Sequence, residues 1–207
     1  MKIALIGSGS MATAFATRLG KAGHEVSVTS RNAKSAADLA AATGACVVPA
    51  SRAAEADVLI LATGAADAIP ALKALGDLSG KVVVDITNPL TADYMGLTIG
   101  HSTSSAEEIA RAVPGLRLVK GFNTIFASLL ASGAAPAGSA VTTFLAGDDA
   151  EAKETVADIA RSIGLAVTDA GALKNARYLE PLAGLNIYLG YGAGLGTAIF
   201  PTWLSAA

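Results

Sequence analysis

Short apolar runs alternate with longer amphipathic stretches along most of the chain. Eight of these runs have the length and the Val, Ile and Leu content that are typical of β-strands. They cover residues 2–7, 25–30, 45–48, 57–63, 81–87, 116–122, 141–147 and 165–170. Several are apolar almost throughout, as expected of parallel strands that helices cover on both faces. Strands that alternate with helices predict a doubly wound, mostly parallel α/β sheet.

The stretch after the first run carries a clear helical pattern. Met11, Phe15 and Leu19 recur at a spacing of four residues, and the small residues Ala12 and Ala16 lie beside them. A row of small side chains lets a helix approach a sheet closely. We therefore expect a helix here that packs tightly on the first strands.

Two segments interrupt the alternation of strands and helices. Residues 87–104 form a long connection, and long loops in compact domains are often functional. Ser104, followed three residues later by Glu107, predicts the start of a helix. Residues 174–196 are apolar and helix-like but rich in glycine, so we expect them to pack on another element or on a second subunit.

A segment rich in Gly, Ala and Pro at residues 133–140 is typical of a linker. We therefore divide the chain into a nucleotide-binding core at 1–140 and a short C-terminal α/β extension at 141–207. We expect the extension to complete the sheet, the cleft and a dimer interface.

Composition excludes several classes of function. Charged residues make up only 15% of the 207 residues and the net charge is −2, so a nucleic-acid partner is not expected. The chain has no uninterrupted apolar run of 18 residues or more, which argues against a membrane span, and we expect no targeting peptide. Cys46 is the only cysteine, so no internal disulfide is possible; a cytoplasmic protein is expected.

The first strand leads directly into a glycine-rich turn, Gly7-Ser8-Gly9-Ser10-Met11-Ala12. This is the G-x-G-x-x-A form of the dinucleotide fingerprint, in the strand-to-helix context that the motif requires. Gly7 permits the tight turn, Gly9 lets the backbone approach a pyrophosphate, and Ala12 keeps the helix near the strand. The motif therefore predicts a Rossmann fold that binds a dinucleotide at the helix N-terminus.

The end of the second strand indicates which dinucleotide is bound. NAD-binding proteins place Asp or Glu there, on the ribose 2′-hydroxyl, but this chain has Ser30, Arg31 and Asn32, with Lys34 close by. Hydroxyl, guanidinium, amide and ammonium groups suit the oxygens of a 2′-phosphate, which a carboxylate would repel. A solvated Arg31 without a ligand is the alternative. The pattern favours NADP(H).

Short polar residues follow three later strands, at the edge of the sheet where ligands of this fold bind. They could hydrogen-bond a carboxamide and a ribose without obstructing a flat ring, although each is also compatible with ordinary turns. They are Thr63-Gly64, Asn88-Pro89 and Asn123-Thr124.

The chain lacks a recognisable acid–base or metal site. His24 precedes the second strand and is expected to be structural, and His101 lies in the long loop. Lys120, Lys174 and Arg177 read as isolated charges, with Arg177 and Glu180 spaced as an i,i+3 pair. We assign no catalytic residue and no metal ligand. Hydride passed between two flat rings needs close positioning rather than proton transfer, which favours a second ring cofactor as the partner.

Taken together, the segments GSGSMA…SRN, TNPL, VKGFNT, AGDDAEAK and DAGALKNARYLEPL resemble the NADPH-dependent coenzyme F420 reductase family over nearly the whole chain. The resemblance implies that Ser10 and Met11 meet the pyrophosphate and that Ser30 and Arg31 meet the 2′-phosphate. It implies that Asn88-Pro89 and Asn123-Thr124 line the hydride-transfer site, where coenzyme F420 stacks on the nicotinamide. It also implies a homodimer.

The chain departs from the archaeal members of that family. They carry His-Thr-Ile-Pro where this chain has Phe122-Asn123-Thr124-Ile125, and Gly121 replaces a common alanine. The form here is similar to bacterial relatives and to the cytosolic domain of STEAP-type ferric reductases, whose partner is a flavin. Coenzyme F420 has an acidic tail, but no basic cluster is evident. An NADPH-dependent flavin (FMN or FAD) or ferric reductase and a non-catalytic NADP(H)-binding protein remain as alternatives, whereas a hydroxyacid or imine dehydrogenase would need a larger helical domain.

Overall fold

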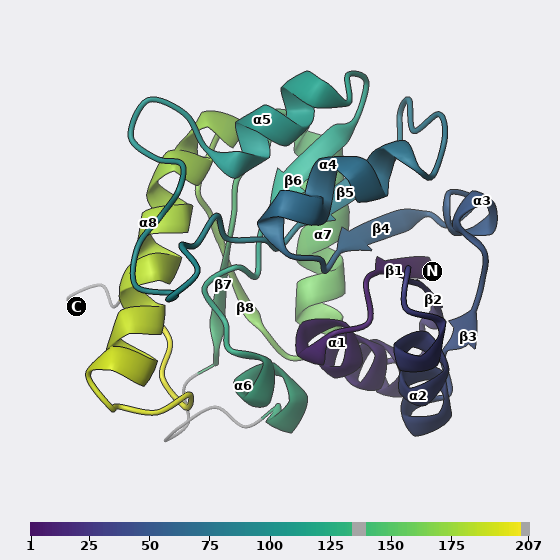
Figure 1. Cartoon of the computed structure of the whole chain (residues 1–207), viewed down its shortest axis with the longest axis horizontal. Helices are drawn as coiled ribbons and strands as arrows, with labels where there is room; N and C mark the ends of the chain where they lie inside the picture. Colours follow the sequence, from purple (N-terminus) through teal and green to yellow (C-terminus); the bar gives the residue numbers. More distant parts are fainter. Residues whose placement is uncertain (134–139, 204–207) are drawn as a thin grey trace.

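The computed structural model describes residues 1–133 and 140–203, and a parallel sheet of six strands lies at its centre (Figure 1). The strand order is β3-β2-β1-β4-β5-β6, so the direction of winding reverses between β1 and β4. The predicted doubly wound Rossmann fold is confirmed. The strands are β1 Lys2–Ile6, β2 Glu25–Thr29, β3 Cys46–Val47, β4 Val58–Leu61, β5 Val82–Asp85 and β6 Arg117–Lys120.

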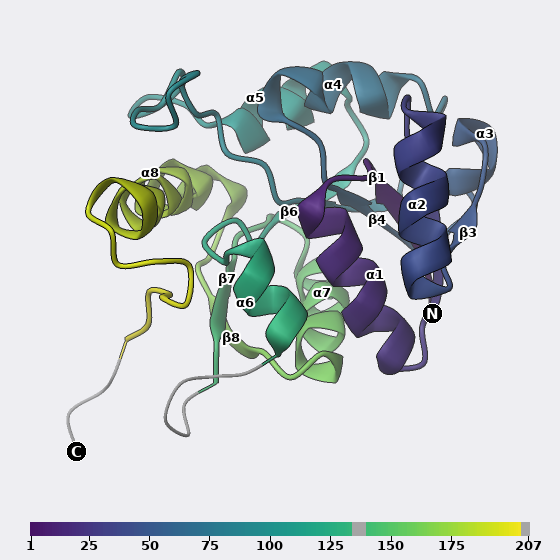
Figure 2. The same ribbon diagram turned by 60° about the horizontal axis from the view of Figure 1, so that its bottom comes forward.

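Helices cover both faces of this sheet, and the alternation of side chains along each strand gives each face its own core. In β1, Ile3 and Leu5 pack toward one face, while Ala4 and Ile6 pack toward the other. Figure 2 shows α4 and α5 on one side of the sheet and α1, α6 and α7 on the other. The helix bounds are α1 Ser10–Lys21, α2 Ala33–Thr43, α3 Ala50–Ala53, α4 Ala65–Lys73, α5 Ser105–Ala112, α6 Ala127–Ser132 and α7 Ala150–Ser162.

The first helix packs as its sequence pattern predicts. Ala12, Ala16, Phe15 and Leu19 are buried in the core that also contains the inward side chains of β1. Phe15 meets Phe122 edge to face, with ring centroids 5.1 Å apart. This ring pair connects the helix of the glycine-rich turn to the end of β6.

The C-terminal extension forms a small second sheet rather than extending the first. Strands β7 Thr142–Leu145 and β8 Ala166–Asp169 pair in parallel with each other, with α7 as their connection. A single antiparallel bridge, Lys120 to Ala146, joins β7 to β6. The ladder stops there because Phe122 takes a positive φ of 57° and donates its backbone N–H to the Thr143 hydroxyl. The division near residue 140 stays a prediction, and residues 134–139 of the expected linker lie outside the described residues.

The predicted C-terminal helix is shorter than its apolar pattern suggests. A 3-10 turn at Leu173–Asn175 leads into α8 Ala176–Ile187, and a wide turn at Tyr188–Gly192 ends the helical region. Gly194 and Gly196 take positive φ values of 73° and 78°, which turn the chain away from the helix axis. Over the residues that the structure describes, no helix is long and apolar enough to cross a bilayer.

A buried ion network anchors α8 to the main sheet. The Lys120 ammonium lies 2.9 Å from both the Asp85 and Glu180 carboxylates, and all three side chains are at most 1% exposed. The ammonium also donates to the backbone carbonyl of Thr87, just beyond β5. Glu180 in turn accepts the backbone N–H groups of Ser105 and Ala106 at the start of α5.

This network corrects the sequence interpretation of its members. Lys120 is not an isolated charge, and Glu180 does not pair with Arg177. Arg177 instead binds Glu107 on α5 through two hydrogen bonds of 2.7 and 2.8 Å, and its guanidinium lowers the pKa of Glu107. Helix α8 is therefore held to α5 by two separate carboxylate contacts.

Removal of the Lys120 charge should destabilise the fold strongly. Lys120→Met leaves two buried carboxylates without their cation, and losing one partner of a buried ion pair costs about 3–5 kcal/mol. Urea unfolding should show a loss of that size, while Lys34→Met at an exposed position should change the free energy of unfolding by less than about 0.5 kcal/mol. A loss below about 1 kcal/mol for Lys120→Met would contradict this role of the network.

Candidate functional site

The carboxyl ends of β1, β2 and β4 open into a cleft of about 590 Å³. Its polar side is formed by the glycine-rich turn and by the ends of β2 and β4, and its apolar side by α4 and the segment before α3. The strand order reverses here, between β1 and β4, where ligands bind in open α/β sheets. The predicted residues that line the cleft are Gly7, Ser8, Gly9, Ser30, Arg31, Thr63 and Gly64.

The two glycines of the turn have different structural roles. Gly7 has a φ of 120°, and a Cβ atom there would lie 2.3 Å from the carbonyl oxygen of Ala62, so no side chain fits. Gly9 has an extended backbone and caps α1, and a Cβ atom there would meet nothing within 4 Å. The fold requires the first glycine. The second keeps the surface above the helix N-terminus open, which is what close approach of a phosphate needs.

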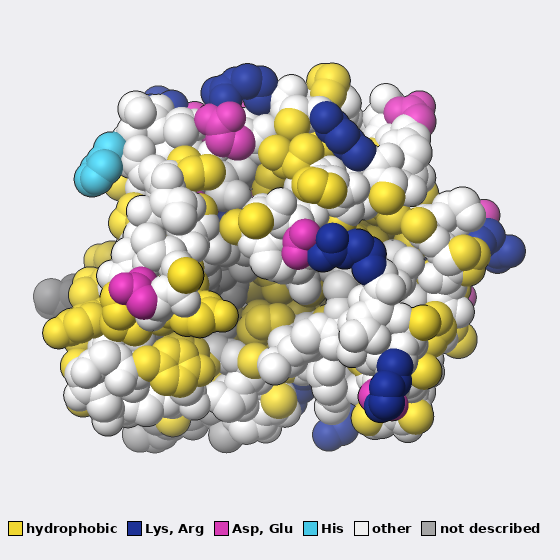
Figure 3. Space-filling view, viewed as in Figure 1, with side chains coloured by type: hydrophobic (Ala, Val, Ile, Leu, Met, Phe, Trp, Pro, Cys, Tyr) yellow, Lys and Arg dark blue, Asp and Glu magenta, His cyan; other side chains and the backbone are white. Residues whose placement is uncertain are grey.

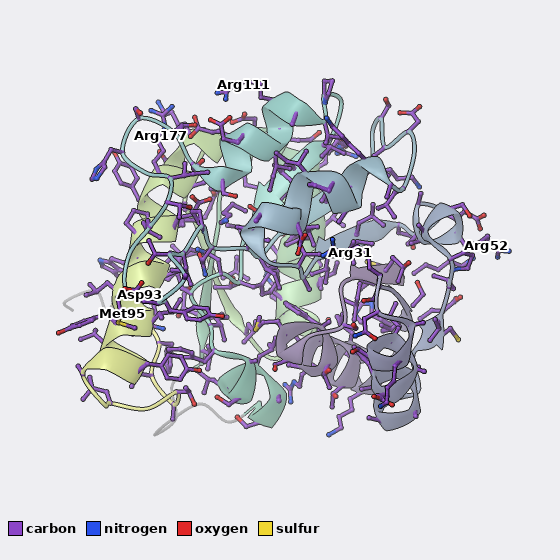
Figure 4. The ribbon with its side chains drawn as sticks, in the orientation of Figure 1. Arg31, Arg52, Asp93, Met95, Arg111 and Arg177 are labelled. Carbon is purple, nitrogen blue, oxygen red and sulfur yellow. The ribbon has the colours of Figure 1, made fainter. Side chains whose placement is uncertain are left out.

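Ser30 and Arg31 lie at the rim of the cleft. The Ser8 hydroxyl donates to the Ser30 hydroxyl at 2.9 Å, which links the glycine-rich turn to the end of β2. Arg31 reaches across to α4, where its guanidinium lies 2.7 Å from the Asp67 carboxylate. Figure 4 shows Arg31 next to α4, near the middle of this face of the molecule.

The other two residues predicted at this rim do not line the cleft. Asn32 is the N-cap of α2, and its side-chain oxygen accepts the backbone N–H of Ser35. Lys34 lies in the first turn of α2 and pairs with Asp38 at 2.7 Å, and both side chains are exposed. Capping explains an Asn at this point of the sequence without any ligand.

A second, smaller pocket of about 220 Å³ lies between the ends of β5 and β6 and helix α8. Figure 3 shows this face hollowed between α8 and the start of α1, with hydrophobic side chains on the floor. Met11 and the apolar residues Ile86, Phe122 and Ile125 contribute to its walls. The predicted residues that line it are Met11, Asn88, Asn123 and Thr124.

Two asparagines hold the loops around this pocket together. The side-chain amide of Asn88 donates to the Asn123 carbonyl oxygen at 2.8 Å. Asn123 donates back to the Asn88 side chain and also to the carbonyl oxygen of Leu179 on α8. Asn186, further along α8, donates to the carbonyl oxygen of Thr124. The ends of β5 and β6 are therefore fixed to each other and to the C-terminal helix.

Several buried oxygens near the strand ends have no hydrogen-bond partner within the described residues. They are the hydroxyls of Thr63, Thr87 and Thr124 and the side-chain oxygen of Asn123. Buried polar groups are almost always hydrogen-bonded in native proteins. Thr63 lines the larger cleft, and Asn123 and Thr124 line the smaller pocket. Unpartnered oxygens at these places fit a ligand that carries polar groups along a mostly apolar path.

The lining of the smaller pocket holds no carboxylate, imidazole, amine or guanidinium among the described residues. Tyr94 and Tyr191 are its titratable side chains. His24 contacts Ser162 at 2.9 Å, and burial lowers its pKa, while His101 is exposed in the long loop. The described part of the chain also brings no three His, Cys, Asp or Glu side chains together as metal ligands. The mostly apolar walls of the pocket are suited to hold a flat group.

The remaining predicted residues lie around these two pockets. Ser10 begins α1 and faces a groove that α1, α6 and Tyr191 line together. Pro89 lines a further groove beside Asn88 and Gly64. Ala12 is buried against the sheet, as its proposed spacing role requires, and lines neither pocket.

Sequence reasoning missed several residues of the site. Asp67 faces the first cleft from α4, and no motif marks it. Tyr94 and Tyr191 come from the long loop and from the turn after α8, so only the fold brings them to the pocket. Asn186 did carry a signal, because it is a polar residue within the apolar C-terminal pattern.

Known proteins that resemble this chain are described as reductases or oxidoreductases. The family model for coenzyme F420-dependent NADP oxidoreductases matches residues 2–89. The F420-dependent NADP reductase of Methanothermobacter thermautotrophicus is 31% identical, in an alignment that covers 91% of this chain and 89% of that protein. Metalloreductase STEAP3 of Rattus norvegicus is 34% identical over 182 residues; these cover 87% of this chain but only 36% of STEAP3, so the chain spans about a third of that relative.

Among solved structures, one from Arthrobacter sp. FB24 is similar over almost its full length. It is described as a candidate F420-dependent NADP reductase, and it superposes with a TM-score of 0.86 at 31% identity. The alignment covers 95% of this chain and 96% of that one. The likeness thus includes the small second sheet and α8 as well as the six-stranded core.

Proposed function

Because the chain belongs to the F420-dependent NADP reductase family and is an NADP-dependent oxidoreductase, we propose that it transfers hydride between NADP(H) and the deazaflavin coenzyme F420. The observation that carries the proposal is the smaller pocket, which is ring-sized and mostly apolar and has no carboxylate, imidazole, amine or guanidinium in its described lining. The relative from Methanothermobacter thermautotrophicus, which aligns along most of both chains, supports it.

The larger cleft suits the adenosine half of NADP(H). Its apolar side, which includes Val48, Pro49 and Pro70, provides a surface for a flat base. Ser30 and Arg31 at the rim offer a hydroxyl and a guanidinium to the 2′-phosphate. We assign the pyrophosphate to the open surface at Gly9 and to the N-terminus of α1, which begins at Ser10. The contacts of Asn32 and Lys34 with the dinucleotide stay predictions outside this proposal, because neither residue lines the cleft.

The smaller pocket suits the reacting rings. Bound there, the nicotinamide ring supplies or accepts the hydride. Asn88 and Asn123 hold the ends of β5 and β6 in place. We assign the carboxamide to the unpartnered hydroxyl of Thr124 and side-chain oxygen of Asn123, because both residues line the pocket. Phe122 and Ile125 keep water from the site. Catalysis by positioning needs reacting carbons at about 3–3.5 Å, which rigid pocket walls favour.

A metal or flavin reductase is the second candidate. Identity of 34% to metalloreductase STEAP3 over 87% of this chain favours it. In that case the same pocket would hold FMN or FAD in place of the deazaflavin. The absence of charged side chains from the described lining also suits an acceptor without a long acidic tail. A non-catalytic NADP(H)-binding protein would bind the dinucleotide tightly and reduce no acceptor.

A cytoplasmic homodimer is the form that we propose for this enzyme. Tyr178, Leu185 and Tyr188 on and just after α8 are 74%, 54% and 49% exposed, so the outer side of this helix presents apolar surface. Light scattering of the purified protein should give twice the mass of 20.5 kDa. A monomer at micromolar concentration would exclude the dimer.

Substitution of Arg31 tests the assignment of the dinucleotide. Arg31→Ala should weaken NADPH binding about 10- to 100-fold, since hydrogen bonds to charged groups contribute about 1.5–3 kcal/mol. NADH lacks the 2′-phosphate, so its affinity should change by less than about threefold. Titration calorimetry measures both constants. Equal losses for NADPH and NADH would show that Arg31 does not bind the 2′-phosphate.

The acceptor is tested by a stopped-flow assay with NADPH against coenzyme F420 and FMN in parallel. Rapid loss of F420 absorbance, slowed when the transferred hydrogen of NADPH is replaced by deuterium, is the expected result. The Methanothermobacter thermautotrophicus reductase, assayed alongside, shows that the conditions permit the reaction. Reduction of FMN or chelated iron alone would support the second candidate, and NADPH binding without turnover would support the non-catalytic protein.

A further inference from the structure

Asp67 occupies an unexpected position in the larger cleft. It lies in the first turn of α4 and lines the same cleft as Ser30 and Arg31. Its carboxylate contacts the Arg31 guanidinium at 2.7 Å, so an ion pair bridges the cleft from β2 to α4. In Figure 3 a basic and an acidic side chain touch in the middle of this face, where Figure 4 labels Arg31.

The ion pair between Arg31 and Asp67 is weak enough for a charged ligand to separate it. The Arg31 and Asp67 side chains are 78% and 44% exposed, and ion pairs with that much solvent contact are weak. A 2′-phosphate with two negative charges can therefore take the guanidinium from the carboxylate. The carboxylate does not leave, however, because it is fixed to α4 at the wall of the cleft. It remains beside the incoming phosphate as a like charge.

We propose that Asp67 competes with the 2′-phosphate for Arg31 and so sets how strongly the chain prefers NADP(H) over NAD(H). This inference rests on the proposed function, in which the 2′-phosphate binds at Arg31. NAD(H) carries a hydroxyl in place of the phosphate, and a hydroxyl is not repelled by the carboxylate. Asp67 is thus a specificity-determining residue that lowers the affinity for the phosphorylated dinucleotide.

The same rim offers a matched control. Lys34 and Asp38 form an ion pair of the same length, 2.7 Å, and Asp38 is 63% exposed. Neither residue lines the cleft. Asp67→Asn and Asp38→Asn both remove one negative charge from this side of the protein. They differ in whether that charge faces the proposed 2′-phosphate position.

Binding of two small probes isolates the effect from the chemistry of hydride transfer. Adenosine 2′,5′-bisphosphate carries the 2′-phosphate, and adenosine 5′-monophosphate lacks it. Asp67→Asn should bind the bisphosphate about 3- to 10-fold more tightly, since a like charge is removed from beside the phosphate. The monophosphate should change by less than about twofold, as should both probes with Asp38→Asn. The gain should shrink as salt is raised, because the groups are exposed.

Five outcomes would overturn the proposal. Weaker bisphosphate binding by Asp67→Asn would mean that Asp67 positions Arg31 instead of competing for it. Equal gains for both probes, or equal gains from Asp38→Asn, would mean a general charge effect. Arg31→Ala distinguishes failure of the proposed function: if it leaves bisphosphate binding unchanged, the 2′-phosphate does not bind at Arg31 at all. If it weakens binding while Asp67→Asn has no effect, only the role of Asp67 is wrong.

Discussion

The ammonium group of Lys120 organises the part of the molecule that surrounds the smaller pocket. It is fully buried, and in water such a charge would be solvated, so the fold must supply the missing partners. It does so with one carboxylate from β5, one from α8 and a carbonyl oxygen after β5. If β5, β6 and α8 moved apart, the buried Lys120 ammonium would lose its charged partners. The positions of Asn88 and Asn123, which follow these strands, depend on this restraint.

The two pockets are built on different principles. The larger cleft depends on backbone geometry: a glycine at a φ that excludes side chains, a helix N-terminus, and the reversal of strand order. The smaller pocket depends on contacts between distant parts of the chain, such as the hydrogen bond from the Asn123 side chain to the backbone carbonyl oxygen of Leu179. A local motif can encode the first kind of site, whereas the second exists only after the C-terminal extension has packed on the core.

This difference explains how far the sequence could predict the structure. The apolar run at 2–7 and the glycine spacing after it identify β1, the turn and α1, because both signals are local. The same holds for Ser104, whose side chain caps α5. Lys120 and Glu180 are 60 positions apart and read as unrelated charges, since periodicity carries no information about partners. The sequence also predicts a helical segment that extends beyond the end of α8, because the apolar pattern continues through glycines at which the backbone turns.

The buried contact between Phe122 and Phe15 limits which side chains the site can accept at these two positions. Among the described non-glycine residues with positive φ, Tyr94 and His101 are exposed, while Phe122 is completely buried against Phe15. Phe15 belongs to the helix of the glycine-rich turn, and Phe122 immediately precedes Asn123. A smaller or larger ring at either position would alter the spacing between the two halves of the site. The ring that fits at one of these two positions therefore depends on the ring at the other, and the two halves of the site are coupled through this contact.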